Sequence, residues 1–157
     1  MADDVVLTQA ERVFVASART AVLATTPSSG PPRLVPICFV LDETGAPLRI
    51  YSPLDDKPKR VRDPRDLGRV RDIAANPAVA LLIDSWSEDW SALGWVRIEG
   101  RADLIEGGDA AMKTEHAWAV SELRGKYPQY ATHRLEERPI IRIVVVRVRT
   151  WGNLGGG

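Results

Sequence analysis

Four side chains that can donate hydrogen bonds to an anion lie close together in one charged segment of the chain. They are Ser52, Lys57, Lys59 and Arg60. Ammonium and guanidinium groups bind phosphate through charge-assisted hydrogen bonds, and a helix that starts shortly afterwards would add a favourable dipole. Such a charge run is more often a solvated loop, and Asp55 and Asp56 can neutralise this one. Composition alone therefore leaves both interpretations open, with the solvated loop as the commoner case.

Tryptophans form the second notable group: Trp86, Trp90, Trp95, Trp118 and Trp151. Large aromatic rings stack on planar ligands, fill subunit interfaces or pack in the core. Trp118 lies in a predicted amphipathic helix, which favours core packing. Trp86 and Trp90 lie in a polar segment, where burial against a ligand or a second subunit is at least as reasonable.

Classical nucleophilic and metal chemistry find little support in the sequence. Cys38 lies within an apolar segment, where a thiol usually packs as a small hydrophobic group. His116 and His133 are too few and too far apart for a metal set, and no CxxC, HExxH, GxGxxG or GxxxxGK motif occurs. We therefore expect no metal site and neither a Rossmann nor a P-loop enzyme, and the catalytic residues stay unassigned.

Length and charge place the chain among ordinary globular proteins. Its 157 residues suit one domain, with residues 1–7 and 152–157 expected to be flexible. The 21 basic and 21 acidic residues balance, which gives no overall attraction to nucleic acid. A single cysteine, an acidic start without a signal-peptide pattern and the lack of a long apolar run predict a cytoplasmic protein without a membrane span.

Hydrophobic periodicity predicts mostly strands with a few short helices. Thr8 and Glu11 have the spacing of a capping box at the start of a first helix, and Asp109 is a plausible N-cap for another. Pro36 marks an edge or a bulge in its strand, because proline cannot donate a ladder hydrogen bond. Strands are predicted over residues 20–26, 33–41, 48–52, 78–83, 95–99 and 140–148, and helices over 66–75 and 109–124. This order suggests an antiparallel barrel that carries short helices.

Several of these segments, taken in order, resemble the pyridoxamine-phosphate-oxidase-like family. Residues 18–24 and 32–36 resemble its opening hairpin, residues 51–52, 56–60, 73–77 and 79–82 resemble its core, and residues 95–100 resemble a later strand. The loop 56–60, residues 89–91 and residues 126–130 are similar to one actinobacterial branch in particular. That branch depends on coenzyme F-420, an 8-hydroxy-5-deazaflavin.

The resemblance implies a mainly β fold, namely a six-stranded antiparallel split β-barrel like that of FMN-binding proteins. The whole of residues 1–157 would form this single cofactor-binding domain, and two copies would form a homodimer with cofactor sites at the subunit interface. Ser52, Lys57, Lys59 and Arg60 would hold the cofactor phosphate, which now favours the phosphate site over the solvated loop. Val35, Pro36 and Ile37 would line the ring. Trp95 stands where the FMN-binding oxidases often have Gln, which argues against FMN.

The resemblance implies an oxidoreductase that transfers hydride from coenzyme F-420 to an unsaturated or conjugated small molecule. Such a protein must hold the ring and shield it from water, and it needs no side-chain nucleophile. Tyr51, Tyr127, His133 or solvent could supply a proton. The alternatives are an FMN-dependent oxidase or reductase of the same fold, a non-enzymatic protein that binds a cofactor or haem, and a dimer that has lost its site.

Overall fold

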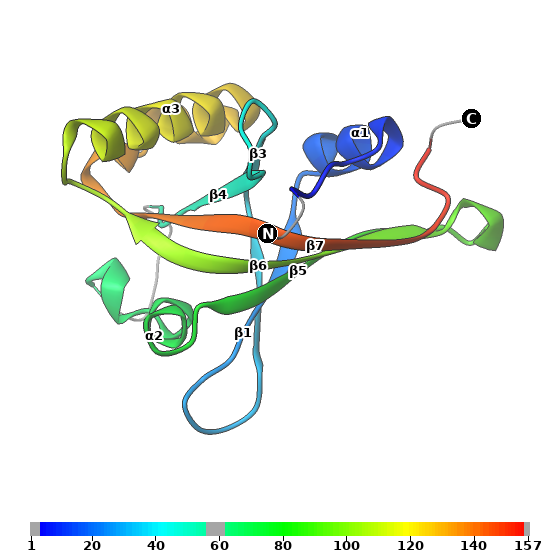
Figure 1. The fold of residues 1–157 in the computed structure, drawn as a ribbon, viewed down its shortest axis with the longest axis horizontal. Coiled ribbons are helices and arrows are strands. Elements are labelled where there is room, and N and C mark those ends of the chain that lie inside the picture. Colours follow the sequence, from blue (N-terminus) through cyan, green and yellow to red (C-terminus); the bar gives the residue numbers. More distant parts are fainter. Residues whose placement is uncertain (1–3, 56–61, 156–157) are drawn as a thin grey trace.

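The computed structural model describes residues 4–55 and 62–155 and contains one antiparallel sheet of seven strands (Figure 1). The sheet order is β2-β1-β5-β6-β7-β4-β3. The strands are β1 (Ala21–Thr25), β2 (Arg33–Ile37), β3 (Val40–Asp42), β4 (Arg49–Pro53), β5 (Ala78–Ser85), β6 (Gly94–Ile105) and β7 (Ile140–Gly152). The helices are α1 (Gln9–Ser17), α2 (Gly68–Ala75) and α3 (Ala110–Lys126), with 3₁₀ turns at Pro64–Asp66, Trp90–Ala92, Pro128–Thr132 and Leu135–Glu137.

The strand predicted over residues 33–41 is two strands, so the expected count of six is wrong by one. β2 pairs with β1 at one end of the sheet order, and β3 pairs with β4 at the other end. Only Cys38 and Phe39 separate the two strands. The chain can change partners over so short a distance only because the sheet curls until its two ends approach each other. The mainly β, antiparallel split-barrel fold is thus confirmed.

Tyr127 supplies a hydrogen-bond partner at the point where the strand changes partners. The backbone N–H of Phe39 donates to the Tyr127 hydroxyl at 3.0 Å. The same hydroxyl lies 2.9 Å from the carbonyl oxygen of Arg19 and 3.0 Å from that of Phe39, and can donate to either. A buried backbone group that leaves a sheet must be satisfied elsewhere, and here a side chain does so.

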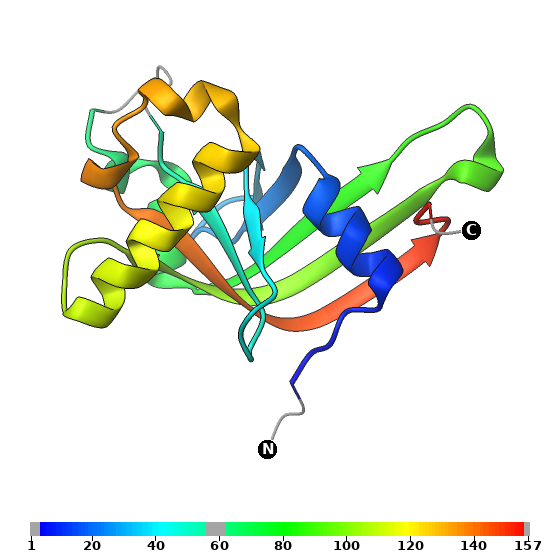
Figure 2. The ribbon, with the colours of Figure 1, turned by 90° about the horizontal axis from the view of Figure 1, so that it is seen from above.

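β6 and β7 are longer than the predicted strands and pair over almost their whole length. The register shifts beside Gly100, where a Cβ atom would lie 2.6 Å from Ile143 Cγ2. Glycine therefore permits the close approach of the two strands at this bulge. Together with β5, these strands form an arm that extends away from α3 (Figure 2). Gly152 belongs to β7, and the N–H of Asn153 donates to the Leu93 carbonyl at 2.7 Å.

Two helices begin where the sequence predicts. At α1, Thr8 and Glu11 form both bonds of the capping box. At α3, the Asp109 side chain accepts from the N–H of Met112. Each cap bonds residues three positions apart, so it depends on local sequence and not on tertiary packing. Among the described residues, no helix is both long and apolar enough to cross a membrane.

The apolar side chains form two cores. The inner core lies within the curled sheet, and α1 and α2 add Val15 and Ile73 to it. The second core lies beneath α3, where Leu123 and its neighbours pack on side chains that point away from the inner core. We call this part of the outer face the covered half (Val40, Tyr51, Ile105 and Ile140). The remainder, formed by β2, β1, β5 and the start of β6, we call the open half (Val22, Ala24, Leu34, Ala80, Leu82 and Trp95).

Candidate functional site

The open half contains an apolar groove of about 440 Å³. Leu34 is 67% exposed and Leu82 is 41% exposed, although both lie in strands. Side chains of this type are normally covered, and a contiguous exposed group of them indicates a binding surface. The lining residues are Val22, Ala24, Leu34, Ala80, Leu81, Leu82, Trp95 and Arg97.

Strand register explains how these residues come together. Cross-strand partners in an antiparallel sheet project from the same face. One row runs through Pro36, Val22, Leu82 and Arg97, and the next runs through Leu34, Ala24, Ala80 and Glu99. The rows are apolar on β2, β1 and β5 and become charged on β6. The groove thus has an apolar floor and a charged margin, where Glu99 pairs with Arg97 and Arg147 at 3.5 Å each.

A polar anchor joins β2 to α2 on the inward face of the sheet, opposite the groove. The Arg33 Nε atom donates to Asp72 Oδ2 at 2.8 Å, and the Thr25 hydroxyl donates to the same oxygen at 2.6 Å. Burial alone would raise the pKa of Asp72, but the bonds from Thr25 and Arg33 outweigh it and lower the pKa below its ordinary value. The carboxylate therefore stays charged and fixes Arg33 against α2. Sequence analysis missed this anchor, because its partners lie 39 and 47 positions apart.

A family model for pyridoxamine 5'-phosphate oxidase matches residues 7–152, which is almost the whole chain. The chain belongs to this family. No curated protein matches the sequence significantly.

Several solved structures share the fold at low sequence identity. The conserved hypothetical protein Rv2991 from Mycobacterium tuberculosis has a TM-score of 0.69 and 21% identity, over 95% of this chain and 87% of that one. An FAD-binding protein from Mesorhizobium loti has a TM-score of 0.58 and 20% identity, over 92% of each chain. The haem storage protein HutZ from Vibrio cholerae has a TM-score of 0.61 and 13% identity, over 90% of each chain. At these identities the likeness shows the fold alone.

The residues expected to line the cofactor ring divide between the two faces of β2. Pro36 lies in an outward row of the open half, beside Leu34. Ile37 is buried in the inner core, and Val35 packs against that core. Val35 and Ile37 can therefore offer only their backbone to a ligand on the open half. β2 is the last strand of the sheet order, so one of its edges pairs with no strand of the described chain.

Trp95 lines the groove. Its register partner on β7 is Trp151, which is 54% exposed. Trp86 and Trp90 are 69% and 74% exposed, so neither packs in the core. Trp118 packs against the second core in a T-shaped contact with Tyr51, as its helix predicted.

Of the expected phosphate-binding residues, the structure describes Ser52 alone. Its side chain is 2% exposed, on β4 opposite Ile141. Lys57, Lys59 and Arg60 lie outside the described residues. Just before that segment, Asp55 is 7% exposed and accepts a hydrogen bond from the Tyr130 hydroxyl at 2.9 Å.

The candidate proton donors lie away from the groove. The Tyr51 hydroxyl donates to Glu115 Oε1 at 2.6 Å in the covered half, and burial together with Glu115 raises its pKa. The Tyr127 hydroxyl serves the backbone of Phe39, and burial raises its pKa as well. His133 packs against the Tyr130 ring in a T-shaped contact. None of these side chains lines the groove, which leaves the catalytic residues unassigned.

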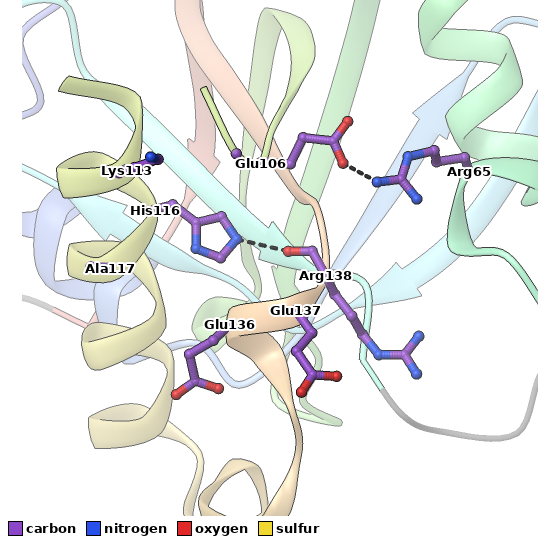
Figure 3. A pocket seen from close by; sticks show the side chains of 9 residues that line it. Arg65, Glu106, Lys113, His116, Ala117, Glu136, Glu137 and Arg138 are labelled. Carbon is purple, nitrogen blue, oxygen red and sulfur yellow. Dashed lines mark hydrogen bonds and ion pairs between the residues drawn. The ribbon is translucent and has the colours of Figure 1, made fainter. Parts of the chain in front are cut away.

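A second cavity, of about 470 Å³, lies between α3, the 3₁₀ turn at Leu135–Glu137 and the end of β6 (Figure 3). Two of its charged lining residues pair with each other, Arg65 with Glu106, and a third, Glu136, binds Arg124, which does not line the cavity. His116 Nε2 lies 2.7 Å from the Arg138 carbonyl oxygen. Within residues 4–55 and 62–155, no three His, Cys, Asp or Glu side chains are close enough to hold a metal ion.

Proposed function

We propose that the groove of the open half binds the ring of a flavin-type cofactor, specifically coenzyme F-420, and that the protein is an oxidoreductase. The observation that carries this proposal is an exposed apolar groove, walled by Trp95, in a chain of the pyridoxamine 5'-phosphate oxidase family. Such a surface suits a planar aromatic ring, because the ring can bury its apolar faces against Leu34, Leu82 and the indole of Trp95.

The residues of the chain hold the ring and exclude water from it. Pro36 and Leu34 lie along one side of the groove and Trp95 along the other, with the backbone of Val35 and Ile37 at the ring's polar edge. Ser52, Lys57, Lys59 and Arg60 hold the phosphate, an assignment based on the family resemblance. When bound, the deazaflavin supplies the hydride, and an unsaturated or conjugated small molecule accepts it.

Trp95 supports a deazaflavin over FMN. A flavin presents a ring nitrogen that accepts a hydrogen bond at its reactive position, and a deazaflavin has carbon there. Where the face of the indole ring, and not its N–H edge, meets this position, the nitrogen stays unsatisfied, whereas the carbon needs no donor. FMN remains the alternative cofactor, and the experiment below compares the two.

A second copy of the chain completes the site. No segment of the described chain covers the open half, whereas α3 covers the other half. The apolar rows can bury their surface against the same rows of a second copy. The charged margin can form polar contacts around them through Arg97, Glu99 and Arg147. The cofactor site then lies at the interface of a homodimer.

Haem is a weaker fit to the groove. Haem iron is held by a His, Cys, Met or Tyr side chain, and none of the groove-lining residues is of these types. The likeness to HutZ is a likeness of fold. The titration below therefore includes haemin as a comparison ligand.

The test is a calorimetric titration of the purified protein with coenzyme F-420, FMN and haemin in separate experiments. We expect micromolar affinity for F-420, with FMN weaker by about tenfold, which is the effect of one lost hydrogen bond. Trp95→Gln should narrow that gap, and Trp118→Phe, away from the groove, should leave it unchanged. Tighter binding of FMN would replace F-420 in the proposal, and binding of haemin alone would make the protein a haem binder. No binding of any ligand would show that the site has been lost.

A further inference from the structure

The outward face of β6 and β7 carries an excess of positive charge beside the groove. Buried and outward residues alternate along β6, and the inner core takes Ile98 and Ala102 of β6 and Val148 of β7. The arginines between and beside these residues therefore face outward, although the whole chain has a net charge of zero. We call the four exposed arginines of this surface the basic strip (Arg97, Arg101, Arg147 and Arg149).

Strand register brings like charges together in the basic strip. Arg97 and Arg149 are register partners, and like charges directly opposite each other destabilise a sheet. Glu99, the register partner of Arg147, lies 3.5 Å from a guanidinium nitrogen of Arg97 and 3.5 Å from one of Arg147. Neither Arg101 nor Arg149 makes a hydrogen bond or an ion pair with a residue that the structure describes. One carboxylate thus serves two arginines of the strip, and the other two have none.

The same two strands pair their charges further along, in the covered half. Arg142 is the register partner of Asp103 and binds it through Nη2 at 2.6 Å. Glu115 of α3 accepts a second bond from Arg142 at 2.7 Å. Opposite charges stand in register there, so the surplus charge of the basic strip belongs to the surface beside the groove and not to β6 and β7 as a whole. Such a surplus attracts anions to this part of the surface.

The basic strip begins where the groove ends. Arg97 lines the groove, and its register partner on β5 is Leu82 of the apolar row. Leu82 in turn pairs with Val22, so this row is apolar at one end and cationic at the other. A ligand that lies along the row meets apolar side chains first and then the guanidinium groups of Arg97 and Arg149. Such a surface suits a planar molecule with an acid group at its edge.

We infer that the hydride acceptor of the proposed reaction is a conjugated acid, and that Arg97 and Arg149 bind its carboxylate. The inference rests on the function proposed above and names the class of substrate for that site. A guanidinium binds a carboxylate through two parallel hydrogen bonds, and neighbouring strands lie about 5 Å apart, so two register partners can share one carboxylate. The cofactor phosphate is assigned to other residues, since Ser52 lies on β4 opposite Ile141 and outside the basic strip.

The experiment compares an acid and an amide that share one ring. The protein is saturated with oxidised coenzyme F-420, or with FMN if FMN binds more tightly, and is titrated with 2-naphthoate and with 2-naphthamide. Calorimetry measures both affinities, so the readout needs no turnover. We expect the wild type to bind the acid about tenfold more tightly, because the amide cannot form charge-assisted hydrogen bonds with the arginines. This preference should shrink as the salt concentration rises, since ions screen exposed charges.

Two substitutions should change the preference in opposite directions. Arg149→Gln removes a charged donor and should weaken binding of the acid by about fivefold or more. Glu99→Gln removes the carboxylate that competes for Arg97 and should strengthen binding of the acid by about twofold or more. Affinity for the amide should change by less than about twofold in both variants, because the amide carries no charge. Arg71→Gln, at an exposed position of α2, is the matched control and should change neither affinity.

The outcomes against the inference point to different roles for the basic strip. A wild type that binds acid and amide equally, or binds neither, would show that the strip does not select an acid. A loss of cofactor affinity in Arg149→Gln would assign the strip to the cofactor, and a weaker dimer by light scattering would assign it to the second copy. Each of these results overturns the inference alone. A protein that binds no cofactor fails before either probe is added, and that result overturns the proposed function and the acceptor with it.

Discussion

In both halves of the outer face of the sheet, apolar side chains point outward at alternate strand positions. Only one of the two halves is covered by a helix. In the covered half, α3 lies over Val40 and Tyr51, and the second core excludes water from them. In the open half, Leu34 and Leu82 are equally apolar and face solvent. Helix α3 therefore covers one half of the outer face, and no described segment of the same chain covers the other half.

Polar groups differ between the halves in the same way. In the covered half, Glu115 accepts from Tyr51 at 2.6 Å and from Arg142 at 2.7 Å, and Arg142 also binds Asp103. At the margin of the open half, Glu99 lies 3.5 Å from both Arg97 and Arg147, and all three side chains are more than one-third exposed. Bonds and contacts made within the chain stabilise the fold, and those left unmade are available to a ligand or a partner. The covered half thus serves stability, and the open half is where we propose that binding occurs.

The largest effect is expected from a cavity in the covered half. Leu123 is fully buried beneath α3, and Leu123→Ala should lower the free energy of unfolding by about 2–5 kcal/mol. Urea unfolding followed by circular dichroism measures this change. Glu122→Ala, at an exposed neighbouring position, should stay within about 0.5 kcal/mol of the wild type. A loss for Leu123→Ala as small as that of the control would show that α3 does not stabilise this half.

A charge in the open half should act on association and leave the fold intact. Leu82→Asp places a carboxylate in the apolar row, and the cost of desolvating it should weaken dimerisation by about tenfold or more. Light scattering over a dilution series measures the dissociation constant, and circular dichroism checks the fold. The control is Val13→Asp, because Val13 is an exposed apolar residue of α1 outside the open half. A wild type that is monomeric at micromolar concentration would refute the dimer, and an unchanged Leu82→Asp would place the interface elsewhere.

The smallest effect is expected at the anchor between β2 and α2. Asp72→Asn should lower stability by about 1 kcal/mol at neutral pH, a modest value because Arg33 is half exposed and water screens its charge. The folded-state pKa of Asp72 lies below its ordinary value of 3.8. Its contribution is therefore complete above that pH and is lost as the pH falls through the folded-state pKa. Thermal unfolding between pH 7 and pH 3 should show the wild type converging on the variant in acid. A constant difference would mean that the carboxylate charge is not involved.

Local signals in the sequence predicted several elements correctly. The capping box of Thr8 and Glu11 and the Asp109 cap each bond residues three positions apart, and both helices begin where expected. Alternating apolar residues located the strands, although Trp95 to Glu99 proved to be the start of a much longer strand. Residues 149–152 at the end of β7 are all exposed, so no buried alternation marks them. Residues 100–105 of β6 still alternate, but the prediction ended at Gly100, where the register shifts.

The candidate site was predictable in part. Trp95 lines the groove, and its contact with a cofactor stays a prediction. Val35, Pro36 and Ile37 were expected to act together, but strand alternation places Pro36 on the open half and the other two towards the core. The anchor of Arg33 and Asp72 was not predicted, because its hydrogen bond joins segments far apart in the chain. Lys57, Lys59 and Arg60 stay predictions.

The sequence by itself determined the helix starts, most strands and, through motifs in a fixed order, the family. These depend on hydrogen bonds and periodicities that span a few residues. The tertiary structure alone decided where residues 33–42 change partners and which apolar half stays uncovered. Those outcomes depend on how the sheet curls, since Tyr127 reaches Phe39 across 88 positions and Arg33 reaches Asp72 across 39. Contacts over such separations form only when the whole sheet closes, and no local pattern encodes them.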